Sequence, residues 1–446
     1  MHLLLLALAL CADLTPPMQT VADRISADSM RGHLSFLASD LLEGRATPSR
    51  GLDLASEYIA AQFRRAGLEP VGDDGYFQTA TVMVREPNWD GFRMTVTGGG
   101  KTLEIDKSEV YLVPDSELNL ESVPVAAVNE RGQITGLEVA RPALVLRLAQ
   151  ELPAVARVSD PEMPGRRAVR GIIVKPELAD LIKNAGEIRL TLHIAAPHER
   201  MAKVRNVAGL LRGADPALRD TYVMLTAHYD HVGARATGDD RIYNGANDDG
   251  SGTVSVIEIA GALAALEPRP KRSLLFVAFF GEERGLMGSR YYARHPLEPL
   301  DKTVADLNLE QVGRTDATNG PQIGTASITG FDFSELPHIV ADAGQLVGVN
   351  VYKDKDASDA FFNRSDNRAL ADAGIPAHTL CVAFDFPDYH KVTDHWEKID
   401  YTNMAKVDRA VALALLRLAS DAPAPKWNEY YPAAQRYAEA AKKLHQ

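Results

Sequence analysis

Residues 222–233 read YVMLTAHYDHVG, a short apolar run followed at once by His228, Asp230 and His231. The run has the length and composition of a buried strand. Similar apolar runs follow at 273–279, 303–309, 347–352 and 376–382. Segments with helical periodicity separate them, at 251–266, 284–294, 333–345, 366–373 and 403–420. Strands that alternate with helices predict an α/β fold, with a mixed, largely parallel sheet sandwiched by helices.

The chain before this alternation changes character twice. Residues 26–42 and 51–66 have the apolar periodicity of helices, and Gly67 follows the second as a stop signal. From about residue 76 to 203, short β-type runs alternate with turn residues, which predicts an inserted β-rich lobe. We therefore expect an N-terminal helical part at 21–75, the lobe at 76–203 and the main domain at 204–446.

Composition excludes several classes of protein. Hydrophobic residues make up 46% and charged residues 24% of the 446 residues, as in a globular protein. A formal net charge of −12 argues against a nucleic-acid partner, which would need a basic surface. Cys11 and Cys381 are the only cysteines, so the chain has no disulfide framework.

The first residues, MHLLLLALALCAD, form an apolar run too short to span a bilayer but as long as a signal-peptide core. We interpret residues 1–20 as a signal segment, which predicts a periplasmic, secreted or lipid-anchored protein. A misassigned start or a buried N-terminal helix is the alternative. No later apolar run is long enough to be a membrane span.

Polar side chains follow the predicted strands at the edge where open α/β sheets bind ligands. They are His228, Asp230, Asp248, Asp249, Glu282, Glu283, Glu310 and His390. Taken singly, each has an ordinary structural reading as a loop residue, a helix cap or a partner of a helix dipole. Together they would crowd negative charge into one crevice, which is costly unless a cation neutralises it. Two imidazoles and three carboxylates suit two zinc ions with one bridging carboxylate.

Five motifs carry a family resemblance: AHYDHVG, GANDDGSGT, FGEERGLMGS, NLEQVGR and DYHKVTD, in this order. They resemble the zinc aminopeptidase family that includes bacterial leucyl aminopeptidases, aminopeptidase Y and glutamate carboxypeptidase. The segment HLSFLASDLLEGRATPSRGLDLASEYIAAQF resembles the N-terminal part of the bacterial members. The lobe at 76–203 lies where many members carry a protease-associated domain.

The resemblance implies a ligand set for two zinc ions per chain. His228 and Glu310 would hold one ion, Glu283 and His390 would hold the other, and Asp248 would bridge them. Zinc in such a site polarises the scissile carbonyl and activates water.

The resemblance also implies roles for residues that do not bind metal. Asp230 would orient the imidazole of His228. Glu282 would act as the general base, and Tyr389 would hydrogen-bond the oxyanion. We assign His231 to shaping the loop rather than to binding metal.

Two features depart from the family pattern. The best-known aminopeptidases carry Asp where this chain has Glu310, which is one methylene longer and can still ligate. The segment RSDN, Arg364–Asn367, resembles a family RSDH segment with Asn in place of His. Arg364 is expected to contact substrate, and the alternative reading of this segment is a helix N-cap by Ser365 or Asp366. The Asp248–Asp249 peptide is expected to be cis, as in the family.

The sequence therefore predicts a metallopeptidase that removes N-terminal residues from peptides, because an acidic crevice attracts a cationic terminus. A carboxypeptidase or dipeptidase of the same fold is an alternative, and Arg364 could then bind the substrate carboxylate. A glutaminyl cyclase, with one zinc, is another. A non-catalytic binding protein, such as the transferrin receptor ectodomain, would lack ligands, and none is missing here.

Overall fold

The computed structural model describes residues 14–446, except 129–133, 136–143, 150–151, 153–155, 164–170, 184–186 and 236–237. Most of the predicted signal segment, with Cys11, lies outside the described residues. The chain divides into two compact units. Unit 1 comprises the chain up to residue 80 with residues 204–233 and 243–446, and unit 2 comprises residues 81–203 and 234–242.

A mixed sheet forms the centre of unit 1. Its strands follow the order β21-β20-β22-β17-β13-β16-β12-β2. The four middle strands β22, β17, β13 and β16 are parallel, whereas β20 and β12 run antiparallel to β22 and β16. The bounds are β2 (Phe77–Glu86), β12 (His198–Leu211), β13 (Tyr222–His228), β16 (Ser273–Phe279), β17 (Thr303–Glu310), β20 (Thr325–Ile328), β21 (Asn350–Tyr352) and β22 (Ala377–Cys381). The predicted mixed, largely parallel sheet is confirmed.

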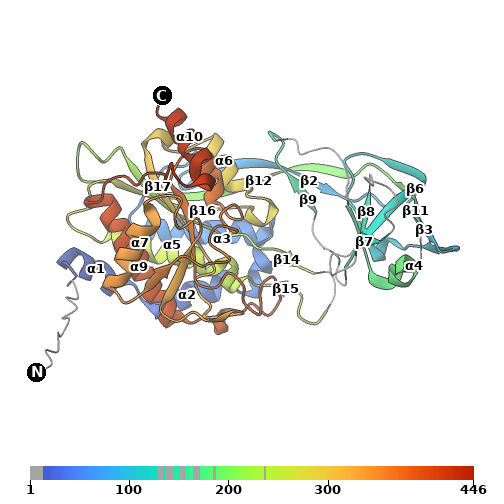
Figure 1. Ribbon diagram of the computed structural model, residues 1–446, viewed down its shortest axis with the longest axis horizontal. Coiled ribbons are helices and arrows are strands. Elements are labelled where there is room, and N and C mark those ends of the chain that lie inside the picture. The colour runs from blue at the N-terminus through green and yellow to red at the C-terminus, as the bar shows by residue number, and fades with distance from the viewer. Residues whose placement is uncertain are drawn as a thin grey trace, which may run out of the picture. The chain divides into compact units, whose positions relative to one another are not determined.

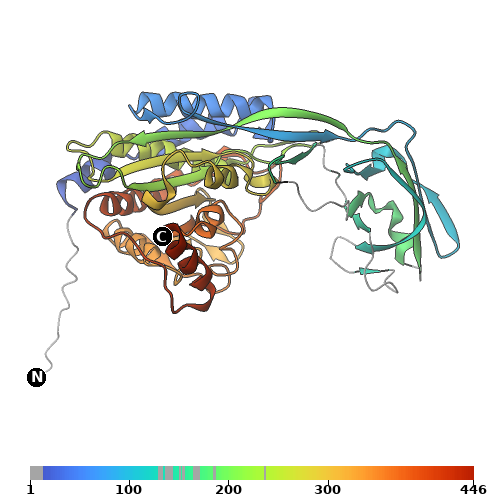
Figure 2. The ribbon, with the colours of Figure 1, turned by 90° about the horizontal axis from the view of Figure 1, so that it is seen from above.

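Helices cover both faces of this sheet (Figure 1, and turned by 90° in Figure 2). Helices α5 (Gly252–Ala264) and α9 (Tyr401–Ser420) pack on β13 and β16, with α7 (Leu336–Leu346) beside α9. The helices α1 (Pro16–Arg24) and α2 (Ala27–Leu37) pack against α9, and α3 (Arg50–Arg65) packs against α5. On the opposite face, α6 (Met287–Arg294), α8 (Asn367–Asp372) and α10 (Gln435–Leu444) share an apolar cluster with Met224 and Val277.

Burial on both faces explains why the middle strands are continuously apolar. Every residue of β13 and of β16 is buried. Strands covered by helices on both sides lose the polar alternation of half-exposed strands. Because β13, β16 and β17 are parallel neighbours, the segments that follow them meet at one edge of the sheet.

The helix predicted at residues 26–42 ends earlier in the structure than predicted. At the N-terminus of α2, the side chain of Ser26 caps the helix by accepting the backbone N–H of Ser29. Helix α2 ends at Leu37. A short 3-10 segment, Asp40–Arg45, follows, in which Glu43 and Arg45 both have a φ of 50°. This left-handed turn breaks the helical path. It places Arg45 in the interior, where it is 1% exposed.

Unit 2 contains a second sheet with the order β4-β3-β11-β6-β8-β10-β5. Its bounds are β3 (Arg93–Gly98), β4 (Lys101–Glu104), β5 (Val110–Tyr111), β6 (Leu118–Val128), β8 (Val145–Leu148), β10 (Gly171–Val174) and β11 (Ile188–Ile194). One short strand, β7 (Ile134–Thr135), lies off this path and pairs with β6. The strand β9 (Arg157–Ser159) pairs with β2 and is the last strand of the first sheet. One side of the sheet, with Val96, Leu146 and Leu190, forms an apolar core. The strands of this sheet, with β7 and β9, lie within residues 76–203, the range predicted for the β-rich lobe.

No candidate metal-binding cluster lies among the described residues of unit 2. Across the described parts of both units, no helix is long and apolar enough to cross a bilayer.

Candidate active site

Three predicted ligands form a first group at the edge of the sheet. His228 is the last residue of β13 and is 1% exposed, and Glu310 is the last residue of β17. The Nε2 atom of His228 lies 3.5 Å from Oδ1 of Asp248 and 3.7 Å from Oε1 of Glu310. The structure thus brings together the residues predicted for one zinc ion.

The second group shares Asp248 with the first. In this group, the Nε2 atom of His390 lies 3.0 Å from Oδ2 of Asp248 and 3.1 Å from Oε1 of Glu283. The two oxygens of Asp248 therefore face different imidazoles, Oδ1 toward His228 and Oδ2 toward His390. A bridging carboxylate must present its oxygens in this way.

The spacing and burial of these atoms fit zinc. Zinc bound at about 2.0–2.2 Å in a tetrahedron separates neighbouring ligand atoms by roughly 3.3–3.6 Å. The four nitrogen–oxygen distances above, from 3.0 to 3.7 Å, bracket this value. Oδ2 of Asp248 and Oε1 of Glu283 are also buried and accept no hydrogen bond. Buried carboxylate oxygens without hydrogen bonds are costly, and a cation would offset that cost.

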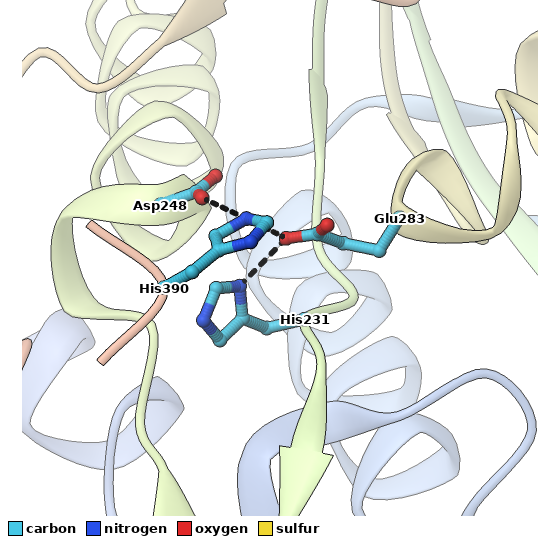
Figure 3. A group of neighbouring side chains, drawn as sticks. All are labelled: His231, Asp248, Glu283 and His390. Carbon is cyan, nitrogen blue, oxygen red and sulfur yellow. Dashed lines mark ion pairs between the residues drawn. The ribbon is translucent and has the colours of Figure 1, made fainter. Parts of the chain in front are cut away.

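His231 belongs to the second group as well (Figure 3). Its ring is fully buried, and its Nδ1 atom lies 2.9 Å from Oε1 of Glu283. Both ring nitrogens lack hydrogen-bond partners. The sequence predicts a loop-shaping role for His231, whereas the structure places its ring among the candidate metal ligands. Gly245 makes room for it, because a Cβ atom there would lie 2.5 Å from the His231 ring.

Asp230 accepts hydrogen bonds from the turn after β16 and from Thr47. Its Oδ1 accepts the backbone N–H of Glu282 at 3.0 Å, and its Oδ2 accepts the hydroxyl of Thr47 at 3.1 Å. The Nδ1 atom of His228 lies 3.5 Å from Asp230 Oδ1 and 3.2 Å from the Asp230 carbonyl oxygen. Asp230 is therefore placed to fix both the imidazole of His228 and the turn that carries Glu282.

The loop that carries Asp248 is held by two further carboxylates. Residues Ala246–Ser251 form one irregular turn before α5, and the Asp248–Asp249 peptide is cis, as predicted. Asp394 accepts the backbone N–H groups of Asn247 and Asp248. Asp249 accepts the N–H of Gln311, the residue after Glu310, at 3.1 Å. These bonds link the loop of Asp248 to the segments that carry His390 and Glu310.

Arg45 is a residue that the sequence reasoning missed. Its guanidinium is buried and donates to the carbonyl oxygens of Leu37, Tyr229, Asn244 and Gly245 at 2.5–2.9 Å. It thereby holds the segment after β13 against the loop that leads to Asp248. Burial lowers the pKa of Arg45 to about 10, which leaves it charged at neutral pH. The only signal in the sequence was its place in the LLEGR stretch of the N-terminal resemblance.

The N-cap reading of Ser365 and Asp366 is wrong, because neither side chain caps α8. Ser365 instead donates its hydroxyl to Oε1 of Glu310 at 2.5 Å and accepts from Nδ2 of Asn308 at 2.8 Å. Asp366 accepts from the hydroxyl of Ser289. Ser365 therefore orients a predicted metal ligand.

Burial and mutual repulsion separate the proton affinities of the carboxylates. Burial raises the pKa of Glu310 to about 7, with Asp248 contributing repulsion. Burial likewise raises the pKa of Glu282 well above its usual range, and Glu310 and Glu283 raise it further. Burial acts the same way on Glu283, but the neighbouring imidazoles of His231 and His390 outweigh it and lower the pKa to about 2. Neighbouring carboxylates with divergent pKa values are typical of catalytic sites.

Tyr389 and Arg364 line the same cavity as Glu282, Glu310 and His390. The Tyr389 ring stacks on His390, with 4.1 Å between the ring centroids. Burial and the nearby carboxylates raise the pKa of Tyr389, so its hydroxyl stays protonated and can donate a hydrogen bond. The structure thus brings every predicted site residue to one edge of the unit 1 sheet.

Residues 206–415 match the model of Peptidase family M28. This part of the chain is an M28 peptidase domain. All the predicted metal ligands and Glu282 lie inside the M28 peptidase domain, whereas Arg45 lies outside the matched range. The family resemblance inferred from the five motifs is confirmed.

Solved structures with the fold of this M28 peptidase domain include two bacterial enzymes. The aminopeptidase from Aneurinibacillus sp. strain AM-1 superposes with a TM-score of 0.62 at 19% identity, covering 91% of this chain and 97% of its own. BSAP, a zinc aminopeptidase from Bacillus subtilis, gives a TM-score of 0.61 at 18% identity, covering 92% and 97%. At this identity the likeness establishes the fold.

Curated relatives match over shorter spans. Leupeptin-inactivating enzyme 1 of Streptomyces exfoliatus is 27% identical over 238 residues, which is 48% of each chain. The probable leucine aminopeptidase 2 of Aspergillus oryzae is 26% identical over 279 residues, which is 54% of this chain and 49% of the relative. The chain thus spans about half the length of these relatives.

Proposed function

We propose that this M28 peptidase domain is a di-zinc aminopeptidase that hydrolyses N-terminal residues from peptides. The observation that carries the proposal is the position of Asp248, whose two oxygens face separate pairs of ligands. His228 and Glu310 would hold one zinc ion with Asp248, and Glu283 and His390 would hold the other. Zinc bound there would polarise the scissile carbonyl and lower the pKa of a water molecule to about 7.

Glu282 is the general base in this proposal. Its backbone N–H is fixed by Asp230, and a carboxylate oxygen of Glu282 lies within 4.8 Å of the ring of His228 and the carboxylate of Glu310. A carboxylate oxygen of Glu282 takes a proton from the attacking water and returns it to the leaving amine. Burial and the neighbouring carboxylates raise the pKa of Glu282, which makes it a stronger base than an exposed glutamate.

Other residues of the chain position the reacting groups. Asp230 holds His228 in orientation, and the Tyr389 hydroxyl donates a hydrogen bond to the oxyanion. Arg364 contacts the substrate. The apolar run within residues 1–13 supports export as a further part of the proposal, and cell fractionation tests it.

Charge favours the aminopeptidase over the alternatives. Four carboxylates line the cavity, those of Asp248, Glu282, Glu283 and Glu310, and such a lining attracts a cationic N-terminus. The names of the relatives and neighbours, which include aminopeptidases from bacteria and fungi, support the same choice. A one-zinc glutaminyl cyclase would not need both groups of ligands.

A matched pair of peptides tests the proposal. A peptide with a free N-terminal amine should be cleaved at least about tenfold faster than its N-acetylated twin, measured as kcat/KM with the zinc-loaded protein. Release of the N-terminal residue, followed by mass spectrometry, is the expected product. Equal rates, or release of the C-terminal residue, would reassign the protein to the carboxypeptidase or dipeptidase class.

A further inference from the structure

Arg364 is an arginine without a charged partner in the candidate active site. It lines the cavity with Glu282 and Glu310. Its guanidinium carbon lies 4.3 Å from the centroid of the Phe361 ring, which it covers. No carboxylate among the described residues pairs with it, and its side chain has no hydrogen bond there.

Two other arginines near the site have partners for their guanidinium groups. Arg45 donates to four carbonyl oxygens, and Arg314 pairs with Asp316 at 2.6 Å and with Asp388 at 2.8 Å. Arg364 differs because a ring, not an anion, holds it. Stacking uses one face of the planar guanidinium and leaves the N–H groups in its plane free to bind a ligand. Phe361 is itself fixed by edge contact with Phe384, with centroids 5.2 Å apart.

The charges around the cavity determine where an anion could bind. Apart from Arg364, the only lining residue that can carry a positive charge is His390, a proposed zinc ligand. A second cavity of about 380 Å³ shares the lining residues Phe361 and Phe384. Asp354, Asp356 and Asp385 line it, and none of its lining residues is basic. A carboxylate would be repelled there, so Arg364 is the favourable place for one.

A second lining residue indicates that the occupant is polar. Gln311 is 7% exposed, and its Oε1 atom is buried without a hydrogen-bond partner. Buried amide oxygens are normally satisfied, so this one would accept an N–H from a bound molecule. A peptide substrate has both an N–H for Gln311 and a carboxylate for Arg364.

We propose that Arg364 binds a carboxylate of the peptide substrate, so that the site selects peptides with a carboxylate close to the scissile bond. The inference rests on the proposed peptidase function and names its substrate class. Arginine recognises carboxylates through two parallel N–H···O bonds, which an isosteric amide cannot match. The carboxylate belongs either to the side chain of an N-terminal Asp or Glu, or to the C-terminus of a dipeptide.

Two acid–amide pairs separate these sources. The first pair is glutamyl-p-nitroanilide and glutaminyl-p-nitroanilide, and the second is Leu-Gly and its C-terminal amide. With the zinc-loaded full chain, we expect kcat/KM to be about tenfold or more higher for the acid than for the amide in one of the two pairs. Preference in the first pair identifies a side-chain carboxylate, and preference in the second identifies the C-terminus.

Variants assign the preference to Arg364. Arg364→Gln should bring the acid-to-amide ratio close to one, and Arg364→Lys should leave an intermediate ratio, because lysine keeps the charge but loses the planar fork. Arg368→Gln is the matched control. It removes a nearby arginine, in α8, that pairs with Asp372 and does not line the cavity, so the wild-type ratio should persist.

Two results would overturn the inference: no acid preference in either pair, or an unchanged ratio in Arg364→Gln. Leucyl-p-nitroanilide, a neutral substrate, tests the proposed function separately. If the wild-type protein hydrolyses none of these compounds, the peptidase proposal fails. Calorimetric binding of the same pairs then still tests Arg364, with the same expected ratios of Kd.

Discussion

The two halves of the candidate metal centre are built in different ways. The half with His228 and Glu310 uses the last residues of two neighbouring strands, and its nitrogen–oxygen distances are 3.5 and 3.7 Å. The half with Glu283 and His390 uses loops, and its distances are 3.0 and 3.1 Å. Exposure also differs, since His228 is 1% and His390 is 36% exposed.

The difference indicates what each half depends on. Backbone pairing within a parallel sheet fixes the positions of His228 and Glu310. The loop around His390 lacks such support and has a left-handed φ of 51° at that residue. Its order comes from side chains: Arg314 pairs with Asp388, and Asp388 also pairs with Lys398. We therefore expect the two halves to respond differently to substitution.

The largest effect should come from Glu282, the proposed general base, which is not a proposed ligand of either half. Glu282→Gln should lower kcat by about 10²–10⁴-fold, because the general base is lost. The zinc content, measured by atomic absorption, should stay unchanged. The adjacent Glu283→Ala is the contrast, since it should lower the zinc content as well as the rate. Near-normal turnover in Glu282→Gln would remove Glu282 as the base.

Removal of one ligand from each half compares them directly. Glu310→Ala and His390→Ala should each reduce the tightly bound zinc from two ions to one and cut activity sharply, because each leaves an ion short of a ligand. We expect thermal unfolding to show the larger loss of zinc-dependent stabilisation for Glu310→Ala, whose half is preorganised by the sheet. Unchanged zinc content in Glu310→Ala would make this carboxylate structural.

Residues that orient the ligands should have smaller effects. Ser365→Ala removes the hydroxyl that donates to Glu310 and should weaken zinc binding in the first half by about 10–100-fold. His231→Phe removes the imidazole beside Glu283 and should weaken the second half instead. Competition with a chelator measures both affinities. The exposed Ser108→Ala in unit 2 is a control and should leave them as in the wild type. A loss of the same ion in both variants would contradict the division into halves.

The smallest effect is a pH dependence of stability without metal. The pKa of Glu310 is raised to about 7, so the folded state binds this proton more tightly than the unfolded state. The free energy of unfolding of the metal-free protein should therefore fall as pH rises from about 4.5 to 7. Zinc needs the ionised carboxylate, so the difference in Tm between zinc-loaded and metal-free protein should widen over this range. The widening should be weaker in Glu310→Gln, and a difference in Tm that stays constant from pH 4.5 to 7 would contradict the assignment.

Much of the fold could be predicted because the local pattern and the tertiary environment agree. The apolar runs at 222–227, 273–279 and 303–309 became β13, β16 and β17 with bounds shifted by at most one residue. The predicted strand at 347–352 was shorter, beginning at Asn350, because Gly348 has a left-handed φ of 70°. Strand β20 was missed, since four residues carry little periodic signal.

The sequence by itself determined which residues could carry the chemistry, because His, Asp and Glu followed successive strands in motifs that resemble one family. The tertiary structure alone decided how they meet. Arg45 lies 184 residues from Tyr229 in the chain yet donates to its carbonyl, and Ser365 lies 55 residues from Glu310. Such contacts depend on how helices and loops pack around the sheet, and neither spacing nor periodicity encodes that packing. The same packing placed His231 against Glu283 and left Arg364 over Phe361 without an anion.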